Sequence, residues 1–270
     1  MNPFNRRKIS IFISMLFLFL LACNATFNVG VPTPTILTPT PTMVPTSVPL
    51  ISQQVTLVSV PFNETNPGSN FPAYTLAAQT PQLTGSDDPR VLAFNQRLND
   101  LVTKEVDMWR QEFQQLPLTS NSNGSSLNVT YTTSSVMNDL WSFKFDFAFY
   151  ADSAAHPGLN SMTLNYDLSQ GRELTLGDLF LPDSNYLDVI SKYCTAELSK
   201  QPFFDSPFSD GAKPTPENYR NWTLSPDGVT ITFDTYQVAP SAAGPQQVVV
   251  PFGVLKSSLN PQGPLAGIVP

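Results

Sequence analysis

Residues 141–149 read WSFKFDFAF and place an aromatic side chain at every second position. Because successive side chains of a β-strand point to opposite faces of its sheet, this alternation predicts a strand that turns five aromatic rings to one side. Aromatic rings bury large apolar areas, so we expect other parts of the chain to cover this face. A platform on which carbohydrate rings stack is the alternative for the same five residues.

Alternating segments on both sides of this stretch supply partners for a sheet. Residues 127–133 precede it, and residues 161–168 follow it with Met162, Leu164 and Tyr166 in phase. Residues 225–228 (SPDG) predict the turn of a hairpin. Further strands are predicted at 54–60, 74–79, 222–224, 229–233 and 246–250.

The clearest helix is predicted over residues 88–115. Asp88 suits the cap and Pro89 the first helical position. Apolar side chains then recur every three or four residues, at Val91, Phe94, Leu98, Leu101, Val102 and Trp109. A second helix is predicted from Asp183 or Ser184 to Lys200, with Cys194 as a small buried residue, and a short third one over 252–259. These elements predict an α+β fold, a mainly antiparallel sheet packed with two or three helices.

The N-terminus has the parts of an export signal. Residues 5–8 (NRRK) form a basic head, and residues 9–21 are apolar apart from two serines. This run is shorter than the about 20 residues that a membrane-spanning helix needs. Its length is typical of a signal-peptide core, so residues 1–22 are predicted to be a signal peptide.

Residues 20–23 (LLAC) resemble the lipobox of bacterial lipoproteins. The resemblance implies cleavage after Ala22 and a diacylated Cys23 as the new N-terminus. Two buried fatty chains give lasting anchorage, so the lipid bilayer is an expected partner. An ordinary secretory signal with a chance cysteine, or a retained transmembrane helix, are the alternatives.

A proline- and threonine-rich stretch over residues 31–49 follows. Proline fixes φ and removes hydrogen-bond donors, so this stretch should run as an extended stalk. We therefore expect a lipidated cysteine and stalk over 23–52, a small α+β subdomain over 53–135, a second α+β domain over 136–260 and a flexible tail over 261–270.

Charge limits the choice of partners. Charged residues make up only 13 % of the chain, and removal of the three cations at residues 6–8 takes the formal net charge from −7 to −10. A body this acidic is repelled by phosphate backbones, so we expect no nucleic-acid partner. A cationic protein such as lysozyme would instead be attracted.

Four stretches in the second half occur together: 150–157 (YADSAAHP), 164–180, 233–240 (FDTYQVAP) and 248–252 (VVVPF). In order and spacing they resemble the extracytoplasmic domain of unknown function shared by RsiV-type anti-sigma factors and peptidoglycan deacetylase C, over about residues 140–260. Ser153 and Ala154 stand where that pattern has two glycines. The resemblance implies a binding or sensing domain outside the cytoplasm. Lysozyme is what the anti-sigma relatives recognise, and in the deacetylase the chemistry belongs to a separate domain.

The candidate ligand-contacting residues lie in these stretches: Tyr150, His156, Asp167, Asp178 and Tyr236. His156 is the only histidine, and a lone histidine in a loop is more often a structural hydrogen-bonding residue than a ligand contact. Asp167, Asp178 and Asp234 could form an acid pair or a calcium site, whereas turn and capping roles explain them more simply.

Several activities are not expected. Eight residues before the apolar run leave no room for a sigma-binding segment, and a metal-dependent deacetylase of the known kind needs two histidines. No G-x-S-x-G elbow, P-loop or paired metal spacing is present. We therefore expect a non-catalytic domain without cofactor or metal that binds cell-wall glycan (peptidoglycan) or a lysozyme-like protein. An accessory scaffold of an envelope complex, or a glycan hydrolase, are the alternatives.

Overall fold

The computed structural model describes residues 49–68, 72–118, 124–201, 204 and 208–269. All of them belong to one compact unit, Ser47–Pro270. The predicted signal peptide, Cys23 and all but the last residues of the predicted stalk lie outside the described residues. Among the described helices, none combines the length and the apolar character needed to cross a membrane.

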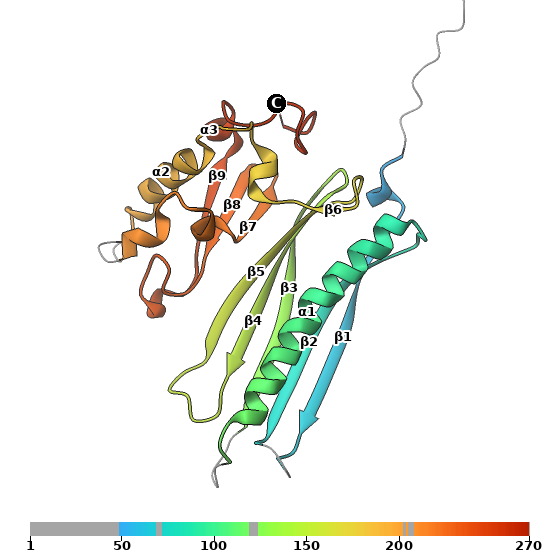
Figure 1. Ribbon diagram of the computed structural model, residues 1–270, viewed down its shortest axis with the longest axis vertical. Helices are drawn as coiled ribbons and strands as arrows, with labels where there is room; N and C mark the ends of the chain where they lie inside the picture. Colours follow the sequence, from blue (N-terminus) through green and yellow to red (C-terminus); the bar gives the residue numbers. More distant parts are fainter. Residues whose placement is uncertain (1–48, 69–71, 119–123, 202–203, 205–207, 270) are drawn as a thin grey trace, which may run out of the picture. The chain divides into compact units, whose positions relative to one another are not determined.

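The larger of two sheets has six strands in the order β1-β2-β3-β4-β5-β6 (Figure 1). Their bounds are β1 Thr56–Asn66, β2 Tyr74–Thr84, β3 Ser125–Met137, β4 Leu140–Tyr150, β5 Gly158–Asp167 and β6 Arg172–Glu173. Neighbours pair antiparallel except β2 and β3, which are parallel. Parallel neighbours need a long crossover, and helix α1 (Pro89–Gln115) supplies it. The predicted α+β class is confirmed, and the structure also contains one parallel crossover, β2–α1–β3, that the sequence did not predict.

Helix α1 begins as the sequence predicts. The carboxylate of Asp88 accepts a hydrogen bond from the backbone N–H of Arg90, and Pro89 occupies the first turn. The apolar side of α1 packs on the larger sheet, where Phe94 is fully buried. The ring centroid of Phe94 lies 4.8 Å from that of Tyr166 and 6.0 Å from that of Phe143. These ring contacts hold α1 against β4 and β5.

The aromatic strand is β4, and its rings are core residues. Phe143 and Phe145 are 0 % exposed and Phe147 is 1 % exposed beneath α1. At the end of the strand, Phe149 stacks on Trp109 with ring centroids 4.1 Å apart. A carbohydrate-stacking platform on this face is therefore wrong, because no sugar could reach the rings.

The smaller sheet has the order β7-β8-β9 and carries its own core. Its strands are β7 Trp222–Ser225, β8 Gly228–Phe233 and β9 Gln246–Pro251, and the helices beside it are α2 Tyr186–Leu198 and α3 Phe252–Leu255. The predicted hairpin is β7–β8. Cys194 of α2 is fully buried in this core, and burial raises the pKa of its thiol to about 12. The short 3₁₀ helices are η1 Ile51–Gln53, η2 Leu176–Leu179, η3 Phe208–Ala212, η4 Pro216–Tyr219 and η5 Ser241–Ala243.

Several element ends differ from the sequence prediction. Helix α2 begins at Tyr186, because Asp183 adopts the left-handed φ of 61° that a helix cannot continue. Strand β2 runs on through Pro81, which is tolerated because β3 pairs with β2 only as far as Ala78. Helix α3 ends at Leu255 rather than residue 259.

The described unit also extends beyond the predicted domain limits. Ile51, predicted as stalk, is 7 % exposed, and its N–H donates to the carboxylate of Asp139. Leu265, in the predicted tail, is 4 % exposed in the second core. Strand β3 runs across the predicted boundary at residues 135 and 136, so the larger sheet takes strands from both sides of it.

A polar contact joins the two sheets. The outer edge of β7 faces side chains of the larger sheet on the side opposite α1. The Asn165 amide nitrogen donates to the Trp222 carbonyl at 2.7 Å, and the Leu224 N–H donates to the Ser142 hydroxyl at 3.1 Å. The Ser142 hydroxyl in turn donates to the Asn165 amide oxygen at 2.7 Å. Side chains thus satisfy backbone groups that an edge strand would otherwise leave unpaired.

Candidate binding cleft

Two predicted contact residues lie near the start of β5. Tyr150 ends β4 and is half-buried. His156 lies exposed in the loop that leads to β5, with its Nδ1 3.2 Å from the carbonyl of Pro157. Ser153, which replaces a glycine of the family pattern, has a φ of 68°. The loop therefore keeps the left-handed turn that glycine favours, although a serine side chain occupies the position.

Asp167 lies at the other end of β5 and has a turn role. Its carboxylate accepts hydrogen bonds from the Ser169 hydroxyl at 2.6 Å and from the Gln170 N–H at 3.1 Å. The side chain is buried, at 7 % exposure. This arrangement closes the turn between β5 and β6.

Asp178 has a capping role at η2. Its carboxylate accepts from both the N–H and the hydroxyl of Thr175, each at 2.7 Å, and pairs with Arg172 at 3.0 Å. Burial raises the pKa of Asp178, but the hydrogen bonds from Thr175 and the charge of Arg172 outweigh burial and lower the pKa overall. The carboxylate form is therefore the one that the fold stabilises.

Replacing Asp178 by asparagine should lower the free energy of unfolding by about 1 kcal/mol at neutral pH. Because the folded state lowers the pKa of Asp178, its contribution is present at neutral pH and disappears as the pH falls below the ordinary carboxyl range. Urea unfolding of the wild type and Asp178→Asn should therefore differ at neutral pH and converge in acid. An equal difference at every pH would contradict this assignment.

The remaining candidate, Tyr236, is 63 % exposed with a φ of 69°. Nearby Asp234 forms an ion pair with Arg220 and accepts from the Asn221 amide. The five predicted contact residues are not brought together, since β5 separates Tyr150 and His156 from Asp167 and Asp178. Within the described ranges, no three His, Cys, Asp or Glu side chains are grouped closely enough to hold a metal ion.

A hollow lies elsewhere, along the outer edge of β5. It has a volume of about 570 Å³ and lies between α1, β5 and the segment before β7. A second hollow of about 360 Å³ shares Thr163 and Arg220 with it. We call the two adjoining hollows the β5 cleft. The first is lined by Arg97, Asp100, Leu101, Lys104, Glu105, Phe147, Asn160, Ser161, Met162, Thr163, Arg220, Asn221 and Asp234.

The cleft exists because β5 is an outer strand over most of its length. Strand β4 pairs with β5 along one edge. On the other edge, β6 pairs only with Tyr166 and Asp167, so the preceding residues of β5 have no strand neighbour on that side. Instead, the Asn221 amide donates to the carbonyl of Ser161 at 3.0 Å. The edge is thus capped by a side chain, and a groove remains beside it rather than a further strand.

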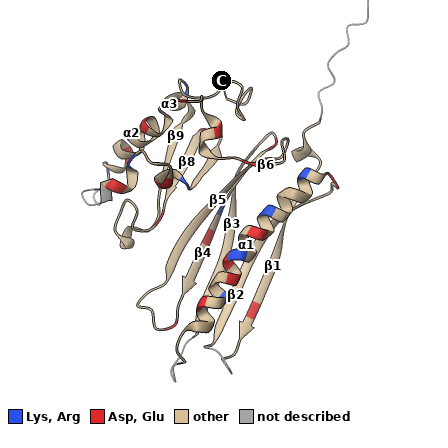
Figure 2. Cartoon of the chain, in the orientation of Figure 1, with Lys and Arg blue, Asp and Glu red and all other residues tan. Residues whose placement is uncertain are grey.

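Most charged groups that line the cleft have a partner. Figure 2 shows both acidic and basic residues along α1. Arg97 forms an ion pair with Glu173 at 2.7 Å, and Asp100 accepts from the Gln96 amide at 2.6 Å. The ion pair neutralises Arg97, whereas the Gln96 amide provides Asp100 with a hydrogen bond and leaves its negative charge.

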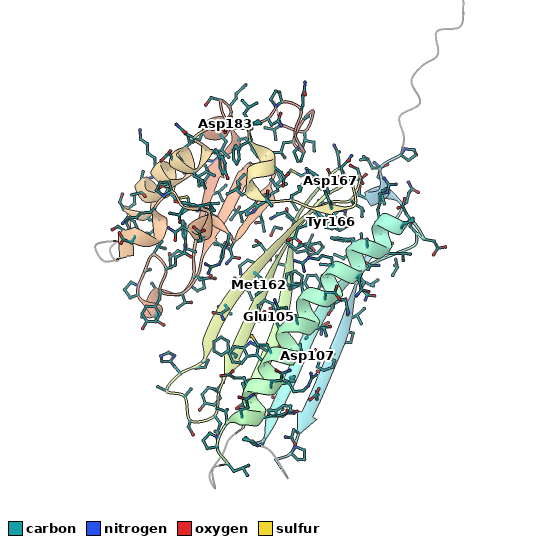
Figure 3. All side chains as sticks on the ribbon, viewed as in Figure 1. Glu105, Asp107, Met162, Tyr166, Asp167 and Asp183 are labelled. Atoms are coloured by element: carbon teal, nitrogen blue, oxygen red, sulfur yellow. The ribbon has the colours of Figure 1, made fainter. Side chains whose placement is uncertain are left out.

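Two charged residues of the larger hollow, Lys104 and Glu105, are exceptions among the described residues, and of these only Glu105 is buried. It is 8 % exposed, lines the larger hollow, and has no hydrogen bond or ion pair with any described residue. Figure 3 labels Glu105 on α1 and Met162 on β5, which line the same hollow. Burial raises the pKa of the Glu105 carboxyl, and the charge of Lys104 lowers it in part. Sequence analysis missed Glu105, although it lies four residues after Leu101 and so continues the inward side of the helix.

The fold and this cleft define an α+β domain with a groove at the open edge of its larger sheet. Residues 177–253 match the family model described as "Protein of unknown function (DUF3298)", so a DUF3298 domain is present. That segment supplies one wall of the cleft, whereas α1 and β5 precede it.

Known proteins resemble longer parts of the chain. The peptidoglycan-N-acetylmuramic acid deacetylase PdaC of Bacillus subtilis is 28 % identical over 168 residues, which are 61 % of this chain and 36 % of PdaC. Esterase Rv3036c of Mycobacterium tuberculosis is 26 % identical over 166 residues, 58 % of this chain and 69 % of that protein. The chain thus spans little more than a third of PdaC.

A solved structure shares the fold. The crystal structure of a DUF3298 family member from Bacteroides fragilis superposes with a TM-score of 0.59 at 18 % identity, covering 79 % of this chain and 96 % of that one. The shared architecture therefore extends well beyond residues 177–253.

Proposed function

We propose that this chain is a lipoprotein, anchored outside the cytoplasmic membrane by acylated Cys23, whose RsiV-like domain binds cell-wall glycan in the β5 cleft without catalysing a reaction. The lipobox-like residues 20–23 and the basic head support export and anchorage. The relative named for peptidoglycan acts on a polymer that lies outside this membrane, which also supports export.

The β5 cleft is the observation that carries the proposal. Two adjoining hollows of about 570 and 360 Å³ form the groove, and these volumes are in the range of small-molecule binding sites. The exposed amide of Asn160 can hydrogen-bond to sugar hydroxyls, and so can the half-buried hydroxyl of Thr163, whose oxygen also accepts from the Trp222 N–H. Met162 offers an apolar contact. A groove of this composition favours an oligosaccharide over a purely apolar ligand.

Binding rather than catalysis is supported by the placement of the reactive side chains. His156 is not among the residues that line either hollow. The larger hollow has two further carboxylates: Asp234 is held by Arg220 and Asn221, and Asp100 accepts a hydrogen bond from the Gln96 amide. The hollow therefore offers Glu105 no carboxylate that is without a partner of its own.

Filling the cleft should abolish glycan binding. Asn160 is exposed on β5 and lines the larger hollow, so Asn160→Trp should occupy it without disturbing the core. We expect the full chain in detergent micelles to bind soluble peptidoglycan fragments in calorimetry, and Asn160→Trp to bind at least about tenfold more weakly. The matched control is Asn128→Trp, at an exposed position of β3 that lines neither hollow. Equal binding by both variants and the wild type would rule out the cleft.

A lysozyme-like cationic protein is the second candidate, because the formal net charge of −7 attracts it. Attraction of this kind weakens with added salt and depends on the whole surface. A complex with lysozyme that is lost in salt but unchanged by Asn160→Trp would favour this candidate over the glycan.

A further inference from the structure

Glu105 occupies a position where an apolar side chain would stabilise the helix more. Its neighbours on the inward side of α1, Leu101 and Val102, are 7 % and 3 % exposed. A carboxylate at such a position loses part of its hydration, and this loss is unfavourable when no partner compensates it. Side chains that sacrifice stability in this way are frequent at functional sites.

No cation of the described protein forms an ion pair with Glu105, although the charge of Lys104 acts on it. Arg97 is bound to Glu173, and Arg220 is bound to Asp234. Lys104 is exposed and makes no ion pair with Glu105. The cleft therefore contains one buried carboxylate that is open to a ligand and lacks the donor it would be expected to have.

We propose that the β5 cleft selects glycan with free amino groups, and that the ammonium group of such a sugar binds the carboxylate of Glu105; this inference rests on the proposed function. Leu101, Phe147 and Met162 are the apolar side chains that line the same hollow, together with polar and charged ones. An ammonium ion forms a charge-assisted hydrogen bond with a carboxylate, which is stronger than a hydrogen bond between neutral groups.

An N-acetylated sugar would fit this site less well. Its amide nitrogen is neutral and has one N–H, whereas an ammonium group has three donors and a positive charge. With an acetylated sugar bound, Glu105 would still be a buried charge without a counter-ion. The selected ligand class is therefore de-N-acetylated amino sugar within a glycan chain.

The test compares two tetrasaccharides that differ only in acetylation, the tetramer of glucosamine and the tetramer of N-acetylglucosamine. At about pH 6 the free amines are largely protonated. We expect the full chain in detergent micelles to bind the glucosamine tetramer at least about tenfold more tightly by calorimetry. Glu105→Gln should cancel this preference, because glutamine keeps the shape of the side chain and removes its charge.

The matched control is Glu112→Gln, which removes the same charge from an exposed position on the same helix. Glu112→Gln should keep the preference for the glucosamine tetramer. If the preference came from a general attraction of cations to an acidic protein, both variants would weaken it equally. Equal binding of the two tetramers by the wild type overturns the inference and leaves glycan binding intact. Failure of both tetramers and of peptidoglycan fragments to bind overturns the proposed function as well.

The stability of the wild type and of Glu105→Gln without ligand provides a second test. Because Glu105 has no partner in the described protein, Glu105→Gln should unfold at a urea concentration no lower than the wild type. A marked loss of stability would show that the carboxylate supports the fold rather than a ligand, and would overturn the inference.

Discussion

Replacing Phe94 by alanine should lower the free energy of unfolding by about 3–5 kcal/mol. Phe94 is fully buried, and its ring contacts those of Trp141, Phe143 and Tyr166 at centroid distances of 6.1, 6.0 and 4.8 Å. Truncation leaves a cavity where α1 meets two strands, and the aromatic contacts are lost with it. Urea unfolding followed by tryptophan fluorescence should show the transition at a much lower denaturant concentration.

Leu92→Ala provides the control for Phe94→Ala. Leu92 is 55 % exposed on the same helix, so this substitution should change the free energy of unfolding by no more than about 0.5 kcal/mol. A similar small effect of Phe94→Ala would mean that α1 does not pack on the aromatic strand as described.

Local signals explain why the core of the larger sheet could be predicted. The alternation at 141–149 requires only neighbouring residues to be compared, and the buried rings of β4 follow from it. The start of α1 is equally local, since Asp88 and Pro89 act within one turn. The same holds for Asp178, whose capping partner Thr175 lies three residues away.

Non-local pairing explains what the sequence did not show. The parallel contact of β2 with β3 depends on the crossover through α1, which joins strands about 40 residues apart. The cleft likewise forms only when α1, β5 and the segment before β7 meet. The burial of Glu105 was not predicted, because helical periodicity identifies inward positions by their apolar residues. A single carboxylate at an inward position does not form a periodic pattern that could be recognised.

The second large effect is expected at the contact between the sheets. Asn165→Ala removes the donor to the Trp222 carbonyl and the acceptor for the Ser142 hydroxyl, both at 2.7 Å. Asn165 is 3 % exposed, so no water readily replaces the lost amide. Each buried group left without a partner costs about 1–3 kcal/mol, and we expect a total loss of about 2–4 kcal/mol in the free energy of unfolding.

The region of the protein that loses stability in Asn165→Ala can be measured as well as the size of the loss. Amide hydrogen exchange should speed up at Leu224, whose N–H donates to Ser142, because Ser142 then lacks the group that orients it. Asn160→Ala is the matched control, at an exposed position of the same strand, and should leave that exchange rate unchanged. If Asn165→Ala behaves like the control, the smaller sheet is held by other contacts, such as the hydrogen bonds from Asn221 to Ser161 and from Trp222 to Thr163. If the exchange rises as expected, a polar contact fixes the wall of the cleft that Arg220 and Asn221 provide.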